Sequence, residues 1–376
     1  MTEWKIPLYK INHNKDDEIF VSKVIRRNMG WAIGPEINKF EKNLAEYVGT
    51  KFCISFNSGT SALHASLLSI GLKSNQEIIV PSFTFIATAN SVLMAGGIPH
   101  FVDIEKENYG LDPVQTEHSI SKNVKAIMPV HYAGLPCKIN ELRNIADKKK
   151  IYLIEDAAES LGSTTNKKMI GTFGDLSVLS FAPNKIITTG EGGAVLTNSK
   201  TLYEKLKLIR SHGRLETSNY FSSSLKPKYV TLGYNWRMPS MIAALGLSQL
   251  NRIEKLINMR RKNAHFISNK LKKFSEITLP TEPKHEKHVF QLYSILLPNF
   301  KQRNSLMAFL VKKGIMTKVY FEPIHTTQFY KKVNFKKSEL KNTLEISNRI
   351  ISLPIYPDLT QNELQYIVDS ISNFFK

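Results

Sequence analysis

The chain has 376 residues, of which 42% are apolar and 22% charged, and its formal net charge is +19. This composition fits a globular protein of two domains, and no uninterrupted apolar run reaches the ~18 residues that a membrane span requires. The first residues lack the apolar core of a secretory signal, and two cysteines, Cys53 and Cys137, are too few for a disulfide framework or a metal site. We therefore expect a cytoplasmic protein that binds neither metal nor membrane.

The positive charge is carried mostly by lysines spread along helical stretches such as LRNIADKKK (142–150) and NKLKKF (269–274). Neither a zinc-finger spacing nor the aromatic motif of an RNA-binding sheet accompanies these lysines. The charge therefore predicts a solvated basic surface that attracts anionic substrates, rather than a nucleic-acid site.

Short runs rich in β-branched and aromatic residues alternate with helical patterns through the first half of the chain. Strands are expected within residues 51–56, 77–83, 98–104, 124–132, 151–157, 176–182 and 192–198. Helices are expected within residues 60–71, 84–97 and 139–150, which end on glycines or on cations. This alternation predicts an α/β fold with a mostly parallel sheet covered by helices on both faces.

From Pro239 onwards the pattern changes to one long helix, with Leu250, Ile253 and Ile257 at helical spacing. A mixed region of about a hundred residues follows, and we expect it to form a smaller C-terminal domain.

Ligands bind beyond the carboxyl ends of the strands in open parallel sheets, so polar residues directly after apolar runs are the candidates for a site. The first candidate is the turn in NSGTSALHASL (57–67), where Gly59, Thr60 and Ser61 begin a helix. A helix start attracts phosphate through its free N–H groups. The same residues also fit an ordinary N-terminal helix cap.

Two further strand ends carry charged residues. Asp156 follows the run IYLI in EDAAES (155–160), and Lys185 follows a strand in SFAPNKIITTGEGG (180–193). Asp156 fits either a carboxylate aimed into a cleft or the first turn of a helix. Lys185 fits either an amine that forms a Schiff base or a side chain that reaches solvent.

One cofactor explains the three strand ends together. Pyridoxal phosphate requires a phosphate cup, a lysine that binds its aldehyde, and a carboxylate at its pyridine nitrogen. Phe85, in PSFTFIATAN (81–90), lies after another predicted strand and could stack on the pyridine ring, or it could be a core residue.

The chain also resembles a known family, the pyridoxal-phosphate sugar aminotransferases of the DegT/DnrJ/StrS group. The resemblance covers nearly the whole chain through motifs in a fixed order: GPEINKFEKNLAEYVGT, NSGTSALHASL, PSFTFIATANSV, PVHYAGLP, IEDAAESLGS, SFAPNKIITTGEGG, LGYNWRMPSMIAALGLSQL and ISLPIYPDLT. It implies a fold type I aminotransferase, with a large cofactor-binding α/β domain over residues 15–250. It further implies a small C-terminal α+β domain over 251–376, packed with residues 1–14, and a homodimer with shared active sites.

The resemblance also implies a role for individual residues. Lys185 would form the internal aldimine with pyridoxal phosphate, and Asp156 would pair with the pyridine nitrogen. The remaining expected contacts are to the phosphate (Gly59, Thr60, Ser61, Ser180 and, from the partner subunit, Asn235), to the ring (Phe85), to its phenolic oxygen or the substrate (Glu159) and to the sugar (Tyr320 and His325).

Glu159 departs from the family, which often has glutamine or histidine at this position. A second carboxylate beside Asp156 is repelled by the Asp156 charge unless that second carboxylate is protonated or paired. The departure bears on the sugar contact or on the cofactor spectrum and not on the main chemistry.

The implied activity moves an amino group from L-glutamate to a nucleotide-linked keto-sugar, by way of pyridoxamine phosphate, for glycan or polysaccharide biosynthesis. Amination at C4 of a 4-keto-6-deoxy hexose is favoured, and amination at C3 stays open. Two alternatives remain at this point: another fold type I reaction, and a non-enzymatic regulator that uses the basic surface. Lys185 itself argues against the dehydrating branch of the family, which has histidine at that position.

Overall fold

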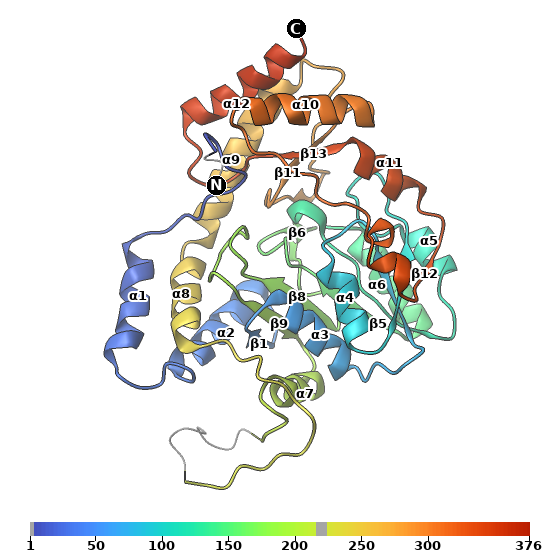
Figure 1. Cartoon of the computed structure of the whole chain (residues 1–376). Helices are drawn as coiled ribbons and strands as arrows, with labels where there is room; N and C mark the ends of the chain where they lie inside the picture. Colours follow the sequence, from blue (N-terminus) through green and yellow to red (C-terminus); the bar gives the residue numbers. More distant parts are fainter. Residues whose placement is uncertain (1–3, 216–223) are drawn as a thin grey trace.

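The computed structural model describes residues 4–215 and 224–376 and is organised around one eight-stranded sheet (Figure 1). The strand order is β1–β9–β8–β5–β4–β2–β3–β12. Strand β9 runs antiparallel to both of its neighbours, and every other pairing in the sheet is parallel. The strands are β1 (Phe52–Phe56), β2 (Glu77–Pro81), β3 (Ile98–Val102), β4 (Val124–Ile127), β5 (Tyr152–Asp156), β8 (Leu176–Ser180), β9 (Gly193–Thr197) and β12 (Lys336–Lys337).

Helices cover both faces of this sheet, because the strands are apolar on both sides. Within β5, Leu153 belongs to one buried cluster and Ile154 to the other, as the twofold repeat of a strand requires. The first cluster packs against α2 (Pro35–Val48), α6 (Ile139–Lys149) and α8 (Ser240–Leu250). The second packs against α3 (Gly59–Ser69), α4 (Ala87–Met94) and α7 (Lys200–Arg210).

The prediction of an α/β fold with a mostly parallel, two-sided sheet is confirmed, and all seven expected strands are present. The prediction of one long helix after Pro239 is wrong. Helix α8 ends at Leu250, and α9 (Ile253–Leu271) begins three residues later. Arg252 leaves the helical conformation (φ −121°, ψ 14°), and its guanidinium binds Asn12 and Asp17. The helix is therefore interrupted at this residue.

A second compact unit lies at the C-terminal end (Figure 1), where α10 (Phe300–Lys312) and α12 (Gln361–Phe374) lie over a two-stranded sheet of β11 (Tyr293–Leu296) and β13 (Ile350–Leu353). Its core includes Ile6, whose backbone pairs with Ile315. Strand β12 crosses back from this half of the chain to pair with β3. The domain boundary at residue 250 stays a prediction.

The remaining elements are short or peripheral. They are α1 (Lys15–Arg26), α5 (Pro113–His118), α11 (Lys341–Arg349), the 3-10 turns η1 (Tyr132–Gly134), η2 (Ile324–Thr326) and η3 (Tyr330–Lys332), and a small sheet of β6 (Thr164–Thr165), β7 (Lys168–Met169) and β10 (Glu286–Lys287). Over residues 4–215 and 224–376, we find no helix with the length and hydropathy of a membrane span.

Phe40 tests the packing between α2 and the sheet. Its ring is fully buried, lies 5.4 Å from the ring centre of Phe181, and would clash with any side chain at Gly246 on α8. Replacing a buried phenylalanine by alanine removes its apolar contacts and leaves a cavity. We expect Phe40→Ala to lower the free energy of unfolding by about 3–5 kcal/mol in urea denaturation.

Phe300→Ala is the matched control, because that ring is 53% exposed. It should change the free energy of unfolding by about 0.5 kcal/mol or less. Equal effects of the two variants would contradict the packing described for Phe40.

Candidate active site

The carboxyl ends of β5 and β8 bring the two principal charged residues together. Asp156 is the last residue of β5 and is only 4% exposed. Lys185 follows β8 by a short turn, and its side chain is 14% exposed. Because β5 and β8 are parallel neighbours, both side chains emerge at the same edge of the sheet.

Asp156 is held in place by two hydrogen bonds. The Thr88 hydroxyl donates to Oδ2 (2.8 Å), and the Ala158 N–H donates to Oδ1 (3.2 Å). Burial raises the pKa of Asp156 above its usual value, although these two donors and the nearby Lys185 charge oppose the rise. Each carboxylate oxygen can accept more than one hydrogen bond, so the group can take a further, cationic donor.

Lys185 is paired with Glu159. The Lys185 amine lies 3.3 Å from Glu159 Oε1, and the Ala133 N–H donates to Oε2 (2.9 Å). This pairing is how the chain accommodates a second carboxylate near Asp156, although the Glu159 charge still contributes to the raised pKa of Asp156. The lysine therefore does not reach into solvent as a snorkelling side chain does.

The turn between β1 and α3 forms a tight corner at the start of the helix. Ser58 is the N-cap of α3, and the Ser61 hydroxyl is bonded to the Asn57 side chain (2.7 Å) within the cap. The first N–H groups of the helix have no partners inside it. A Cβ on Gly59 would lie 3.1 Å from Ser180 Oγ, so the Ser180 hydroxyl stands directly beside the helix start.

Three of the residues predicted to bind the cofactor are exposed to solvent in the isolated subunit. Thr60 and Asn235 are exposed, and Phe85 is 59% exposed with its ring 6.3 Å from that of Phe321. Asn235 pairs with Ser211 in a β-bridge. Their contacts with a cofactor stay predictions.

The two predicted sugar contacts have different hydrogen-bond partners. The backbone carbonyl of Tyr320 accepts a hydrogen bond from the Tyr132 hydroxyl (2.6 Å). Burial, with a contribution from Glu159, raises the pKa of Tyr320 to about 12. His325 lies further along the sheet edge, with Nδ1 2.7 Å from the Ser82 hydroxyl after β2, and burial lowers its pKa.

Sequence reasoning missed two residues that fix the charged groups. Thr88 binds Asp156 with its hydroxyl, and Ala133 binds Glu159 with its backbone N–H. Thr88 lies within the PSFTFIATAN motif, three residues after Phe85, so helical spacing could have indicated it. The Ala133 contact could not have been predicted, because every residue except proline has a backbone N–H and the residue type therefore gives no indication of it.

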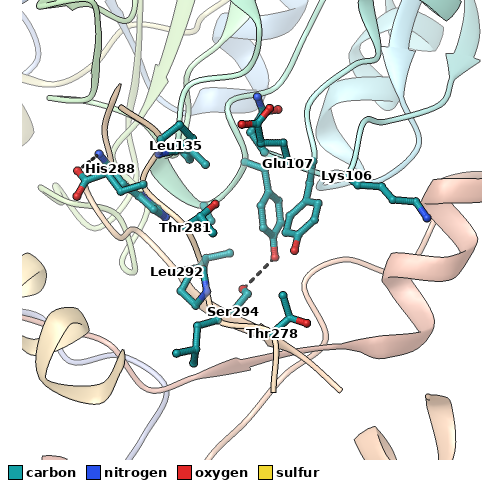
Figure 2. Close-up of a pocket in the computed structure, with 16 residues that line it drawn as sticks. Lys106, Glu107, Leu135, Thr278, Thr281, His288, Leu292 and Ser294 are labelled. Carbon is teal, nitrogen blue, oxygen red and sulfur yellow. Dashed lines mark hydrogen bonds between the residues drawn. The ribbon is translucent and has the colours of Figure 1, made fainter. Parts of the chain in front are cut away.

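A pocket of about 300 Å³ is lined by the Tyr132–Ala133 turn and by residues from both halves of the chain, among them Leu135 and Thr278 (Figure 2). Leu292 and Ser294 line it from the C-terminal half, and the dashed line beside Ser294 is its 3.0 Å hydrogen bond with the Tyr132 hydroxyl. Neither Asp156 nor Lys185 lines this pocket. It shares only the Tyr132–Ala133 wall with the site.

A lysine amine, a buried carboxylate and a helix start at one edge of a parallel sheet are the parts that a pyridoxal-phosphate enzyme requires. Comparison with known proteins agrees with this class. Residues 12–372 match the DegT/DnrJ/EryC1/StrS aminotransferase family, and the chain belongs to that family. It is therefore an enzyme of the pyridoxal-phosphate-dependent sugar aminotransferases.

Two curated relatives and one solved protein illustrate the similarity. GDP-perosamine synthase of Escherichia coli O157:H7 is 33% identical over 370 residues, which cover 98% of each chain. UDP-4-amino-4,6-dideoxy-N-acetyl-beta-L-altrosamine transaminase of Campylobacter jejuni is 33% identical over 345 residues, covering 90% of this chain and 89% of the relative. Spr1654 of Streptococcus pneumoniae has been solved in a PMP form that superposes with a TM-score of 0.91 at 25% identity, covering 98% of this chain and 97% of the other, and in a PLP form.

Gly193 tests the corner beside α3. A Cβ at this position would lie 2.4 Å from the Ser58 carbonyl oxygen and 2.7 Å from the Gly59 nitrogen, so the start of α3 must move. We expect Gly193→Ala to weaken the binding of pyridoxal phosphate by at least about tenfold, measured by absorbance titration of the cofactor-free protein. Gly71→Ala is the control: Gly71 lies just beyond the other end of α3, and its Cβ would meet nothing within 4 Å. Its left-handed backbone (φ +69°) makes the substitution cost stability, but the affinity for the cofactor should stay within about twofold.

The burial of the Asp156 carboxylate predicts a particular dependence of stability on pH. The pKa of Asp156 is raised, so the folded protein binds the carboxyl proton of Asp156 more tightly than the unfolded chain does. The free energy of unfolding therefore falls as the pH rises from 3.8, the ordinary pKa, through the higher pKa of the folded state. Above this pH range Asp156 is ionised in the folded protein, and burial of the charged carboxylate lowers the free energy of unfolding by its full amount. We expect cofactor-free Asp156→Asn to be more stable than the cofactor-free wild type near pH 7, with a difference that shrinks as pH falls toward 3.8. Denaturant unfolding at several pH values measures this, and a less stable variant near pH 7 would contradict it.

Proposed function

We propose that this enzyme transfers the amino group of L-glutamate to a nucleotide-linked keto-sugar, giving 2-oxoglutarate and an amino-sugar nucleotide for glycan or polysaccharide biosynthesis. The observation that carries the proposal is the placement of the Lys185 amine and the buried Asp156 carboxylate at one sheet edge. A lysine amine can attach an aldehyde as a Schiff base, and a buried carboxylate can pair with the pyridinium nitrogen of the same cofactor.

The residues at the site fit pyridoxal phosphate. Lys185 would hold the aldehyde, and Asp156, which is buried and able to accept a further donor, would hold the pyridinium N–H. A Cβ on Gly59 would lie 3.0–3.1 Å from the Ser180 side chain, so the corner is tightly packed, as expected of one that cradles a phosphate. The remaining contacts would come from Thr60, Ser61, Phe85 and the partner's Asn235, which requires a homodimer with shared sites.

When bound, pyridoxal phosphate supplies an electron sink for the carbanion formed at the amine-bearing carbon. Lys185 Nζ removes the proton from Cα of L-glutamate and, in the second half of the reaction, returns a proton to the carbon of the sugar. General acid–base transfer of this kind contributes about 10²–10⁴-fold. Asp156 keeps the pyridine nitrogen protonated, and its burial keeps water from competing for that hydrogen bond.

The ion pair between Glu159 and Lys185 requires a positively charged amine, and it is lost once Lys185 is neutral or covalently bound. Glu159 then keeps the Ala133 N–H and can use its other oxygen to accept a hydrogen bond from a phenolic hydroxyl or from a hydroxyl of the substrate. We assign it, with Tyr320 and His325, to the region where the sugar binds. The raised pKa of Tyr320 keeps its hydroxyl protonated near neutral pH, so that it can donate to a sugar oxygen.

Amination at C4 of a 4-keto-6-deoxy hexose is the favoured outcome. The name of the Campylobacter jejuni relative contains a 4-amino-4,6-dideoxy sugar carried on UDP, and the Escherichia coli relative is named for a GDP-linked sugar. The nucleotide of this enzyme's substrate, and the choice of C4 over C3, are decided by assays with UDP- and GDP-linked keto-sugars.

The proposal is tested on purified holoenzyme by adding L-glutamate alone. We expect the long-wavelength absorbance of the lysine-bound cofactor to fall and 2-oxoglutarate to form in an equal amount. We expect Lys185→Ala to lower the rate of 2-oxoglutarate formation by at least about 10³-fold, because the base is missing. Lys287→Ala, which removes a lysine paired with Glu254 at the surface, is the control and should keep wild-type turnover.

An absorbance band that L-glutamate leaves unchanged would contradict the donor and point to another fold type I reaction. Wild-type turnover in Lys185→Ala would contradict the role of the lysine.

A further inference from the structure

The segment 288–292 of the C-terminal half lies against the turn that holds Glu159. The Val289 N–H donates to the Gly134 carbonyl (3.1 Å), and the Leu292 N–H donates to the Ala133 carbonyl (3.3 Å). The N–H of the same Ala133 binds Glu159. The segment therefore fixes the turn on which the position of Glu159 depends.

The same segment reaches the other partner of the ion pair through one side chain. Gln291 is only 2% exposed, and its Nε2 donates to the backbone carbonyl of Asn184 at 2.6 Å. Asn184 immediately precedes Lys185 in the chain. An apolar side chain at position 291 could fill the space, but it could not hold this carbonyl.

Arg260 of α9 holds the segment from behind. This fully buried guanidinium donates through Nη1 to the carbonyls of Phe290 and Gln291 (both 3.4 Å) and of Ile355 (3.1 Å). Phe290 has a left-handed backbone conformation (φ +49°), and its ring stacks on His288 at 4.0 Å. Left-handed conformations are unfavourable for a bulky residue, so these contacts are what keep the kink in place.

We propose that Gln291 is a positioning residue for Lys185. Its amide fixes the Asn184 carbonyl, while the backbone on either side of it fixes the turn whose Ala133 N–H binds Glu159. The C-terminal half of the chain thereby sets the distance between the Lys185 amine and Glu159, and it sets the direction from which the amine meets the donor's Cα. This inference rests on the proposed function, in which Lys185 Nζ moves the proton.

The test compares holoenzymes of the wild type, Gln291→Met and Gln291→Asn. Methionine keeps the size of the side chain without the donor, and asparagine keeps the amide but is one methylene too short to reach Asn184. Gln249→Met is the matched control, because Gln249 is also 2% exposed and its Nε2 binds Asn12 and Asp17 away from the site. Two quantities are measured: the pH midpoint of the absorbance titration of the lysine-bound cofactor, and kcat and KM for L-glutamate.

Both Gln291 variants should shift the absorbance midpoint beyond the scatter of replicate wild-type titrations and lower kcat by about tenfold, with KM changed by about twofold or less. Gln249→Met should lose stability without either change. Wild-type midpoint and kcat in either folded Gln291 variant would overturn the proposal, as would equal shifts in Gln249→Met. Failure of the proposed function is distinguishable, because the wild-type holoenzyme itself would then lack the lysine-bound band or the response to L-glutamate.

Discussion

The carboxylate of Asp156 at the end of β5 is the constraint on which the site depends. An ionised carboxylate with 4% exposure is costly unless donors compensate it. Within residues 4–215 and 224–376, Asp156 accepts hydrogen bonds from the Thr88 hydroxyl and the Ala158 N–H, and the charge of Lys185 lies nearby. In the cofactor-free protein burial therefore disfavours the ionised form of Asp156, and a pyridinium nitrogen would stabilise that form. The sheet places this carboxylate: β5 is a central strand, flanked by β8 and β4, and its carboxyl end lies where Lys185 can approach.

The second structural requirement is the position of the lysine, which two halves of the chain define together. Glu159 binds the amine, Ala133 binds Glu159, and the segment 288–292 binds both the turn of Ala133 and the residue before Lys185. This arrangement explains how a glutamate can occupy a position where the resemblance leads one to expect glutamine or histidine. Its charge is balanced by the lysine in the cofactor-free protein, and that balance changes once the amine is bound or neutral.

Much of this could be predicted from the sequence, because strand ends in a parallel sheet are marked by polar residues after apolar runs. Asp156 and Lys185 were indicated in that way, and so was the turn at Gly59. The break between α8 and α9 could not be predicted, because it depends on Arg252 binding residues some 240 positions earlier in the sequence. Ala133 and Gln291 were missed for a related reason: one acts through its backbone, and the other is a buried glutamine whose partner is a carbonyl 107 positions away.

The attachment of the cofactor to Lys185, opposite Asp156, can be tested by fixing the cofactor in place with a chemical reduction. The holoenzyme is reduced with borohydride and digested, and the modified peptide is identified by mass spectrometry. The account predicts a pyridoxyl group on Lys185 in the wild type, and a much weaker yield of that adduct in Asp156→Asn. A pyridoxyl group on any other lysine, or none in a protein that shows the lysine-bound absorbance, would contradict it.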